Sequence, residues 1–286
     1  VTLYSYSKGG VSLYGLDLRP AASQARNFTG AFGLGEQDPI AMGKLLAGKR
    51  VGVQASIDSS SEAVYGSSTP EDLETRIQMV YMTFEQPRFD QEIFQVLMRR
   101  NYESLVNAHN DPNRMMSDSL RMISSGYSPR VNIINEEYLD QIKLDEIEKV
   151  YRERISNASD FIFFISGEID AETVKPLVAK YIGSISSTGV SEDWNEENLV
   201  RTPKGRTERI VPIPWETPKT TVYVMFENDK IEYNPRNNTY ISILKRVLDA
   251  RYLKTIRESE GGTYGVGVSA NSSKRPFEGY WLTMSF

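Results

Sequence analysis

Cysteine is absent from this sequence, and histidine occurs once, as His109. Without cysteine there can be no disulfide, no thiolate nucleophile and no cysteine-ligated zinc. Zinc sites that carry out chemistry usually take two or three histidines, so this chain cannot assemble a histidine-rich site by itself. No Gly-x-Ser-x-Gly elbow occurs that would favour a serine nucleophile. We interpret His109 as a solvated or helix-capping residue.

Long apolar runs and a basic balance of charge are also missing. No run approaches the ~18 residues that a membrane span needs, so we expect no membrane span. The net charge of −5 argues against a nucleic-acid partner, because phosphate binding needs a basic face. The length of 286 residues allows two domains of ordinary size. The sequence opens inside what reads as a strand, so we expect a piece of a longer polypeptide.

The first half of the chain alternates between strand and helix patterns. Residues 51–57 place apolar side chains at every second position, which predicts a strand. Residues 63–69 are predicted to form a second strand that runs back along it, giving an antiparallel hairpin. Thr69 is the predicted N-cap of the next helix, Asp90 caps a second one, and residues 135–155 predict two short helical pieces. The first of these helices has one apolar stripe, formed by Leu73, Ile77, Val80, Tyr81 and Phe84.

The middle of the chain changes character. Residues 161–165 are five large apolar residues in a row, which predicts a central strand covered on both faces, and a helix follows. From residue 186 the composition shifts to Ser, Gly, Pro and acidic residues, so we interpret 186–206 as a linker region. The apolar island "RIVPI" (209–213) is interpreted as the first strand of the next unit.

The last part of the chain repeats the plan of the first. A strand at 220–227, a helix at 238–259 and a hairpin from 263–270 to 279–286 are predicted. The final strand would be an exposed, sticky edge if the natural chain ended there. The fold class is therefore predicted as α+β, with tandem domains that each pack an antiparallel sheet against helices, the second being truncated.

The stretch "IRESEGGTYGVGVSA" (256–270) places Arg257 and Tyr264 on either side of a Gly-Gly turn. One interpretation is structural: Gly261 and Gly262 favour a left-handed helix cap, and Arg257 complements the negative end of the helix dipole. Tyr264 would then pack on the hairpin. The local pattern alone leaves this interpretation and a functional one open.

Three longer stretches carry a family resemblance. The segments "LLAGKRVGVQASIDSSSEAVYGSSTPEDLETRIQMVYMTFEQPRFDQEIF", "FIFFISGEIDAETVKPLVAKYIGSI" and "LKTIRESEGGTYGVGVSA" resemble the pitrilysin/insulinase-type zinc peptidases, whose metal motif is His-x-x-Glu-His. The stretches "SKGGVSLYG" and "PWETPKTTVYVMFE" resemble the bacterial branch with four homologous domains in one chain. The resemblance implies repeated α+β domains, folded as two halves that close around a peptide.

The resemblance also implies which half is present. The place of the metal motif reads "AFGLGEQDPIAMGKLLAGKR", without histidine. The chain therefore resembles the C-terminal, non-catalytic half, with a third, inactive domain at 1–195, either complete or lacking its first strand, and the front of the fourth at 206–286. No metal is expected in this chain, and zinc would lie in the N-terminal half. The implied partners are that half and a peptide substrate, and a periplasmic or exported location is favoured.

The family's C-terminal half contributes an arginine and a tyrosine seven residues apart across a glycine-containing turn. Arg257 and Tyr264 match this pair, so the resemblance implies that they bind substrate and stabilise the transition state, while no catalytic residue lies in this fragment. A second hypothesis remains open, in which the longer polypeptide that contains this chain (the parent) lacks the metal motif and serves as a structural or peptide-binding homologue. A parent N-terminal half with or without His-x-x-Glu-His would separate the two.

The composition yields a first test. Because the chain has one histidine and no cysteine, we expect it to hold no stoichiometric zinc and to cleave no peptide. Metal analysis after dialysis, together with a peptide-cleavage assay, would check this. One tightly held zinc per chain would contradict it.

Overall fold

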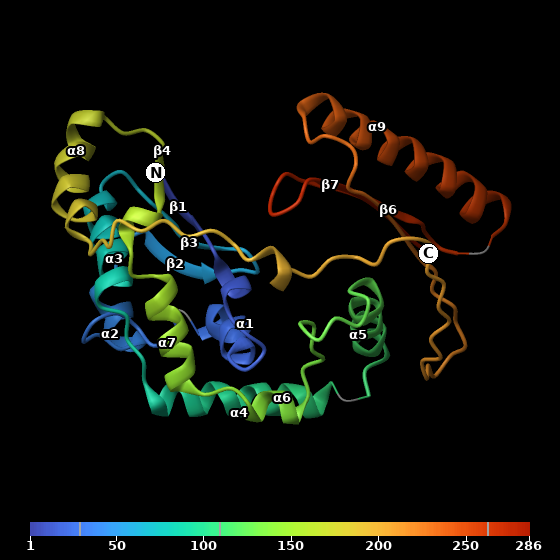
Figure 1. Cartoon of the computed structure of the whole chain (residues 1–286), viewed down its shortest axis with the longest axis horizontal. Coiled ribbons are helices and arrows are strands. Elements are labelled where there is room, and N and C mark those ends of the chain that lie inside the picture. The colour runs from blue at the N-terminus through green and yellow to red at the C-terminus, as the bar shows by residue number, and fades with distance from the viewer. Residues whose placement is uncertain (29, 109, 262) are drawn as a thin grey trace. The chain divides into compact units, whose positions relative to one another are not determined.

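The computed structural model describes residues 1–28, 30–108, 110–261 and 263–286 (Figure 1). The chain divides into two compact units, Val1–Pro203 and Lys204–Phe286, and each is described by itself. His109 lies outside the described residues, and so does the interpretation given to it.

The first unit contains one four-stranded antiparallel sheet of order β2-β3-β1-β4. Its strands are β1 (Thr2–Lys8), β2 (Val51–Ile57), β3 (Ser61–Ser68) and β4 (Ile162–Ser166). Its helices are α1 (Arg19–Phe28), α2 (Pro39–Leu45), α3 (Leu73–Glu85), α4 (Gln91–Asn107), α5 (Pro112–Ser124), α6 (Glu136–Asp140), α7 (Leu144–Arg154) and α8 (Ala171–Lys180), with 3₁₀ turns η1 (Gly10–Leu13), η2 (Ala158–Asp160), η3 (Ile182–Ser184) and η4 (Glu196–Asn198).

Alternation along the strands gives the sheet one buried face and one open face. On β1, Leu3 is fully buried whereas Tyr4 is 44% exposed, and Tyr65 of β3 lies beside Tyr4 on the open face. Helices α1 and α3 pack against β2, and α3 also packs against β3. The predicted hairpin of β2 and β3 is confirmed, with Ala55 paired with Val64 in register.

The predicted apolar stripe of α3 is confirmed, except that Tyr81 is only half-buried. The start of this helix was predicted too early: α3 begins at Leu73, with Asp72 rather than Thr69 as its N-cap. The Thr69 hydroxyl donates to the Asp72 carboxylate and fixes the turn before the helix.

Asp90 caps α4 as predicted, because its carboxylate accepts the N–H groups of Glu92 and Ile93.

The prediction of a central strand at 161–165 is wrong in this chain. Strand β4 pairs only with β1 and lies at an edge of the described sheet. Ile162 and Phe164 are 60% and 56% exposed, because they point to the open face, which the described helices of the unit do not cover. Phe163 and Ile165 point the other way and pack against the core. The run of apolar residues predicted that both faces of the strand are buried, but only one face of the sheet is covered.

The second unit contains a three-stranded antiparallel sheet of order β5-β7-β6. Its elements are β5 (Tyr223–Asn228), α9 (Pro235–Tyr252), a π-helical turn η5 (Leu253–Ser259), β6 (Gly267–Ser273) and β7 (Gly279–Ser285). The order β6-β7-β5 repeats the order β2-β3-β1 of the first unit, and in both cases a helix follows the first strand of the unit. The predicted α+β class with antiparallel sheets against helices is confirmed.

Two predictions for the second unit are wrong. Residues 209–213 form no strand, because none of the described strands pairs with them, and the Ile210 side chain is 92% exposed. The final strand is not an exposed edge either. β7 lies between β5 and β6, and its core-facing side chains Tyr280, Leu282 and Met284 are buried.

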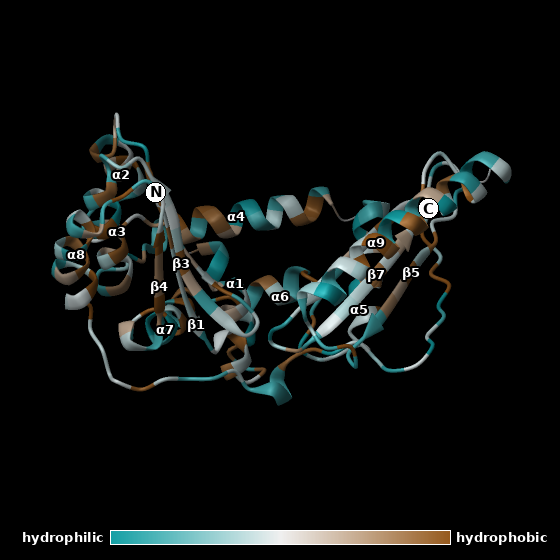
Figure 2. Cartoon of the chain, turned by 90° about the horizontal axis from the view of Figure 1, so that it is seen from above, coloured by the Kyte–Doolittle hydropathy of each residue, from teal (hydrophilic) through white to brown (hydrophobic). Residues whose placement is uncertain are grey.

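The segment 186–203 connects α8 to the end of the first unit without long regular structure (Figure 2). It is nevertheless fixed to that unit by hydrogen bonds. The Glu192 N–H donates to the Asp160 carboxylate at 3.0 Å, and the Asn198 side chain donates to the Ser12 carbonyl at 2.7 Å. A segment whose composition is typical of a linker is therefore attached along much of its length.

A buried charge cluster anchors this segment. The guanidinium of Arg154, 8% exposed, lies 2.6 Å from a Glu192 oxygen and 3.6 Å from an oxygen of Glu62. Glu62 is 1% exposed and accepts the N–H of Gly10 at 2.7 Å. Gly10 has φ +61, and a Cβ there would lie 2.2 Å from a backbone oxygen, so only glycine fits. The cluster links β3, α7 and the connecting segment.

Burial raises the pKa of Glu62 to about 8, and the nearby Asp160 and Glu192 carboxylates add to this while Arg154 and the Gly10 N–H oppose it. The ordinary value is 4.5. Between these two values the folded chain binds a proton at Glu62 that the unfolded chain does not. Stability at this site is therefore fully present below the lower value and is lost as the pH rises through the higher one.

We predict that Glu62→Gln flattens the pH dependence of stability. The amide keeps an acceptor for Gly10 but cannot ionise, so the variant should escape the loss of unfolding free energy, at most about 1.4 kcal/mol per pH unit, that the native chain suffers between about pH 5 and 8. Urea unfolding across this range measures it, with exposed Glu71→Gln as the control. Parallel curves for Glu62→Gln and the native chain would contradict the assignment.

Candidate functional site

The residues singled out by sequence lie at the end of α9, so this helix sets their position. Asn234 caps its start by accepting the Asn237 N–H, and Pro235 occupies the first helical position, where no N–H is needed. The other end packs through Leu248 and Tyr252 against the small core of the second unit. That core consists of Val268, Leu282 and Met284, surrounded by partly buried Val224, Val266 and Ala270.

Arg257 lies in the π-helical turn that ends α9. The Glu260 N–H donates to the Thr255 carbonyl at 3.1 Å, five residues back, which is the wider π-helical pattern. Such single turns are rare and occur frequently at functional sites. Gly261 follows with φ +62, which confirms the predicted left-handed conformation, whereas Gly262 lies outside the described residues.

Tyr264 lies on the far side of the same turn and is fully exposed, at 101% of its reference area. In the part of the chain that the structure describes, neither its hydroxyl nor the exposed guanidinium of Arg257 has a hydrogen bond or an ion pair. The structural interpretation required Tyr264 to pack on the hairpin, and it does not. The fold thus places a cationic fork and a phenolic donor on one turn, both open to solvent.

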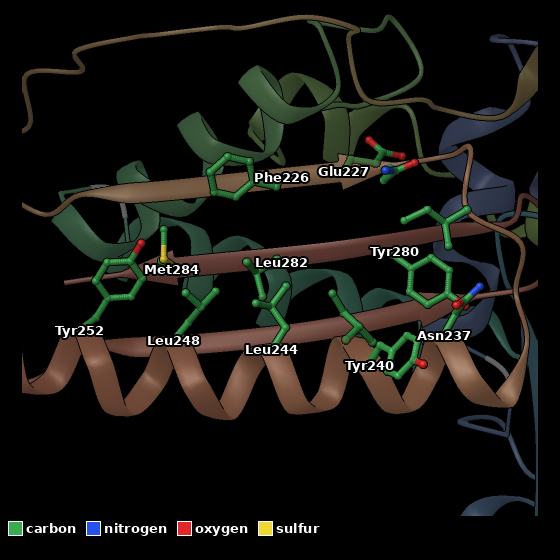
Figure 3. Close-up of a pocket in the computed structure, with 13 residues that line it drawn as sticks. Phe226, Glu227, Asn237, Tyr240, Leu244, Leu248, Tyr252, Tyr280, Leu282 and Met284 are labelled. Atoms are coloured by element: carbon green, nitrogen blue, oxygen red, sulfur yellow. The ribbon is translucent and has the colours of Figure 1, made fainter.

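An apolar groove lies between α9 and the sheet of the second unit, and sequence reasoning missed it. Tyr240, Leu244, Leu248 and Tyr252 project from one side of α9 toward β7 (Figure 3). The groove has a volume of about 740 Å³, and Glu227 and Asn237 are among its polar residues. The signal was the spacing of four residues along the helix, which places these side chains on one face.

Among the described residues, one group of carboxylates lies close enough together to hold a metal ion, namely Glu62, Asp160 and Glu192. Their oxygens already accept from Arg154, from Gly10 and from other donors of the cluster. No histidine takes part, so this donor set does not fit a catalytic zinc. The described helices include none that is long and apolar enough to cross a membrane.

The comparisons with known proteins agree with this architecture. A family model described as "Peptidase M16 inactive domain" matches residues 141–283, which is half of the chain. The chain belongs to this family. The predicted resemblance to the pitrilysin/insulinase-type zinc peptidases is thereby confirmed.

Particular relatives are similar over most of this chain. The probable zinc protease PqqL of Haemophilus influenzae is 20% identical over 239 residues, covering 82% of this chain and 24% of that protein. The structure of the periplasmic protease PqqL from Escherichia coli matches with a TM-score of 0.81 at 14% identity, covering 99% of this chain and 31% of that one. The structure of the ferredoxin protease FusC in complex with Arabidopsis ferredoxin matches with a TM-score of 0.79 at 14% identity, covering 100% of this chain and 31% of that one.

The structural likeness establishes the shared fold, since the identities are low. This chain spans a third or less of the length of these relatives. Their activities on peptides or proteins therefore belong to longer polypeptides, of which this sequence corresponds to one part.

We predict that removing the Tyr264 hydroxyl leaves folding unchanged. Tyr264→Phe should shift the unfolding free energy by less than about 0.5 kcal/mol, as is usual for exposed sites without partners. Tyr280→Phe is the matched control, because its buried hydroxyl contacts the Glu232 carbonyl and Asn238. Its loss should cost about 1 kcal/mol or more. Thermal or urea unfolding distinguishes the two, and an equal loss in Tyr264→Phe would contradict the exposed placement.

Proposed function

We propose that this chain is part of the C-terminal, non-catalytic half of a zinc-dependent endopeptidase, where it encloses peptide and contributes substrate-binding residues to an active site in the N-terminal half. The observation that carries the proposal is the turn between α9 and β6, which exposes Arg257 and Tyr264 with no partner among the described residues. The family membership and the low share of each relative's length support it.

The domain assignment is part of this proposal. Residues 1–195 form the third, inactive peptidase-like domain, residues 206–286 form the front of the fourth, and 186–206 join them. The separation of compact units at Pro203 and the repeated strand order support this division. The zinc would belong to the N-terminal half, because the residues of this chain do not fit it.

The chemistry of the two side chains suits the role. Peptide hydrolysis builds negative charge on the carbonyl oxygen, and a donor aimed at that oxygen stabilises the transition state more than the ground state. The phenol of Tyr264 is such a donor. The guanidinium of Arg257 offers several N–H groups in a fixed planar fork, which suits the recognition of substrate carbonyls or carboxylates. Their exposure leaves these donors available for a bound peptide.

The location of the parent is proposed to be periplasmic or otherwise exported. A cysteine-free sequence is compatible with an oxidising compartment, and the similar Escherichia coli protease is described as periplasmic.

Turnover of the parent polypeptide tests the function. Tyr264→Phe should lower kcat by ~100-fold or more with a smaller change in KM, because only the donor to the developing oxyanion is lost. Arg257→Lys keeps the charge but loses the fork, so a marked loss there would indicate geometric recognition. Tyr223→Phe, at another exposed tyrosine of the second unit, is the control. Unchanged turnover in Tyr264→Phe, or a parent without His-x-x-Glu-His, would overturn the proposal.

A further inference from the structure

The turn that presents Arg257 and Tyr264 has little support of its own. Within the described part of residues 253–266, the hydrogen bonds are local, such as Glu260 N–H to the Thr255 carbonyl and Gly265 N–H to the Thr263 hydroxyl. Nothing described in this turn is buried. Its position therefore depends on how its two ends, the last turns of α9 and the start of β6, are held together.

Leu248 and Tyr252 pack against the small core that contains Val268, and Asp249 adds a polar link between the same two ends. One of its carboxylate oxygens accepts the backbone N–H of Val268 in β6 at 3.3 Å, and the other accepts the Lys245 ammonium at 3.1 Å. Val268 is 4% exposed and lies in an edge strand, where an N–H that points away from the sheet has no ladder partner. Between the described residues of α9 and those of β6, this is the one side-chain hydrogen bond.

The residue type is informative because it is unfavourable for the helix itself. Aspartate has low helix propensity, and the i,i+4 ion pair with Lys245 offsets only part of that cost. Asp249 lies three residues before the end of α9. A residue that is locally disfavoured and makes one specific tertiary contact is expected where a position serves function.

We propose that Asp249 is a positioning residue, which fixes the base of the turn so that Arg257 and Tyr264 are held in place for the peptide. The catalytic consequence of this inference rests on the proposed function. The effect of Asp249 on the turn itself is independent of that function. Its carboxylate contacts Val268 and Lys245, so its effect on the peptide would act through the turn.

The structure offers a matched control at the other end of the same helix. There the Asn238 side chain accepts the Tyr280 hydroxyl at 3.0 Å, which joins the start of α9 to β7. Asn238→Ala removes one helix-to-sheet bond far from the turn, and Asp249→Ala removes one next to it. Asp249→Asn keeps an oxygen that can accept from Val268 and loses only the charge.

The first measurement uses this chain and needs no activity. Hydrogen–deuterium exchange of the amides of residues 260–268, and tryptic cleavage after Lys254 and Arg257, should accelerate about tenfold in Asp249→Ala. Asp249→Asn should stay close to the native rates, and Asn238→Ala should leave the turn unchanged even if it lowers Tm equally. No acceleration in Asp249→Ala, or equal acceleration in Asn238→Ala, would overturn the proposal.

The second measurement uses the parent. Asp249→Ala should lower kcat about tenfold with little change in KM, Asp249→Asn should restore most of it, and Asn238→Ala should not reproduce it. If Tyr264→Phe leaves turnover intact, the proposed function fails, while the exchange data still decide whether Asp249 holds the turn. If Tyr264→Phe is impaired but Asp249→Ala turns over normally, only the positioning role is overturned.

Discussion

One-sided burial of antiparallel sheets is the constraint on which both units depend. Because successive side chains point to opposite faces, covering only one face leaves the alternate residues exposed. In the first unit this buries Leu3 and Val64 under helices and leaves Tyr4, Ile162 and Phe164 on the open face. In the second unit it places α9 over the face that carries Val268 and Met284. The helix covers that face only partly, and the remaining space is the apolar groove.

Buried charge complements this apolar framework at one place. Arg154 lies between Glu62, which is inside the first unit, and Glu192, which belongs to the connecting segment. Removing Glu192 would leave the buried charge of Arg154 without its nearest partner, so the pair favours one path for the segment. The path of the segment around Glu192 is thereby fixed to the first unit.

The exposed turn after α9 follows the opposite principle. It has no buried side chain among its described residues, and its residues make mainly local bonds. A loop of this kind leaves polar groups available for a ligand, at the cost of depending on the elements that flank it. The flanking elements are joined by the packing of Leu248 and Tyr252 against the core of the unit and by the contact of Asp249 with Val268.

The sequence by itself determined the features that depend on local chemistry. The period-two pattern of residues 51–57, the stripe of α3 apart from Tyr81 and the Asp90 cap are short-range signals, and the structure confirms them. Whether a strand lies in the centre or at the edge of a sheet depends on pairing partners far away in the chain. The sequence predicts β4 in the centre, whereas it lies at an edge. It predicts β7 at an edge, whereas it lies in the centre. The turn with Arg257 and Tyr264 was found from sequence, because a glycine turn between a helix and a strand is a local signal. Only the tertiary structure decided that Tyr264 is fully exposed and that Asp249 accepts the N–H of Val268, because both depend on contacts between residues distant in sequence.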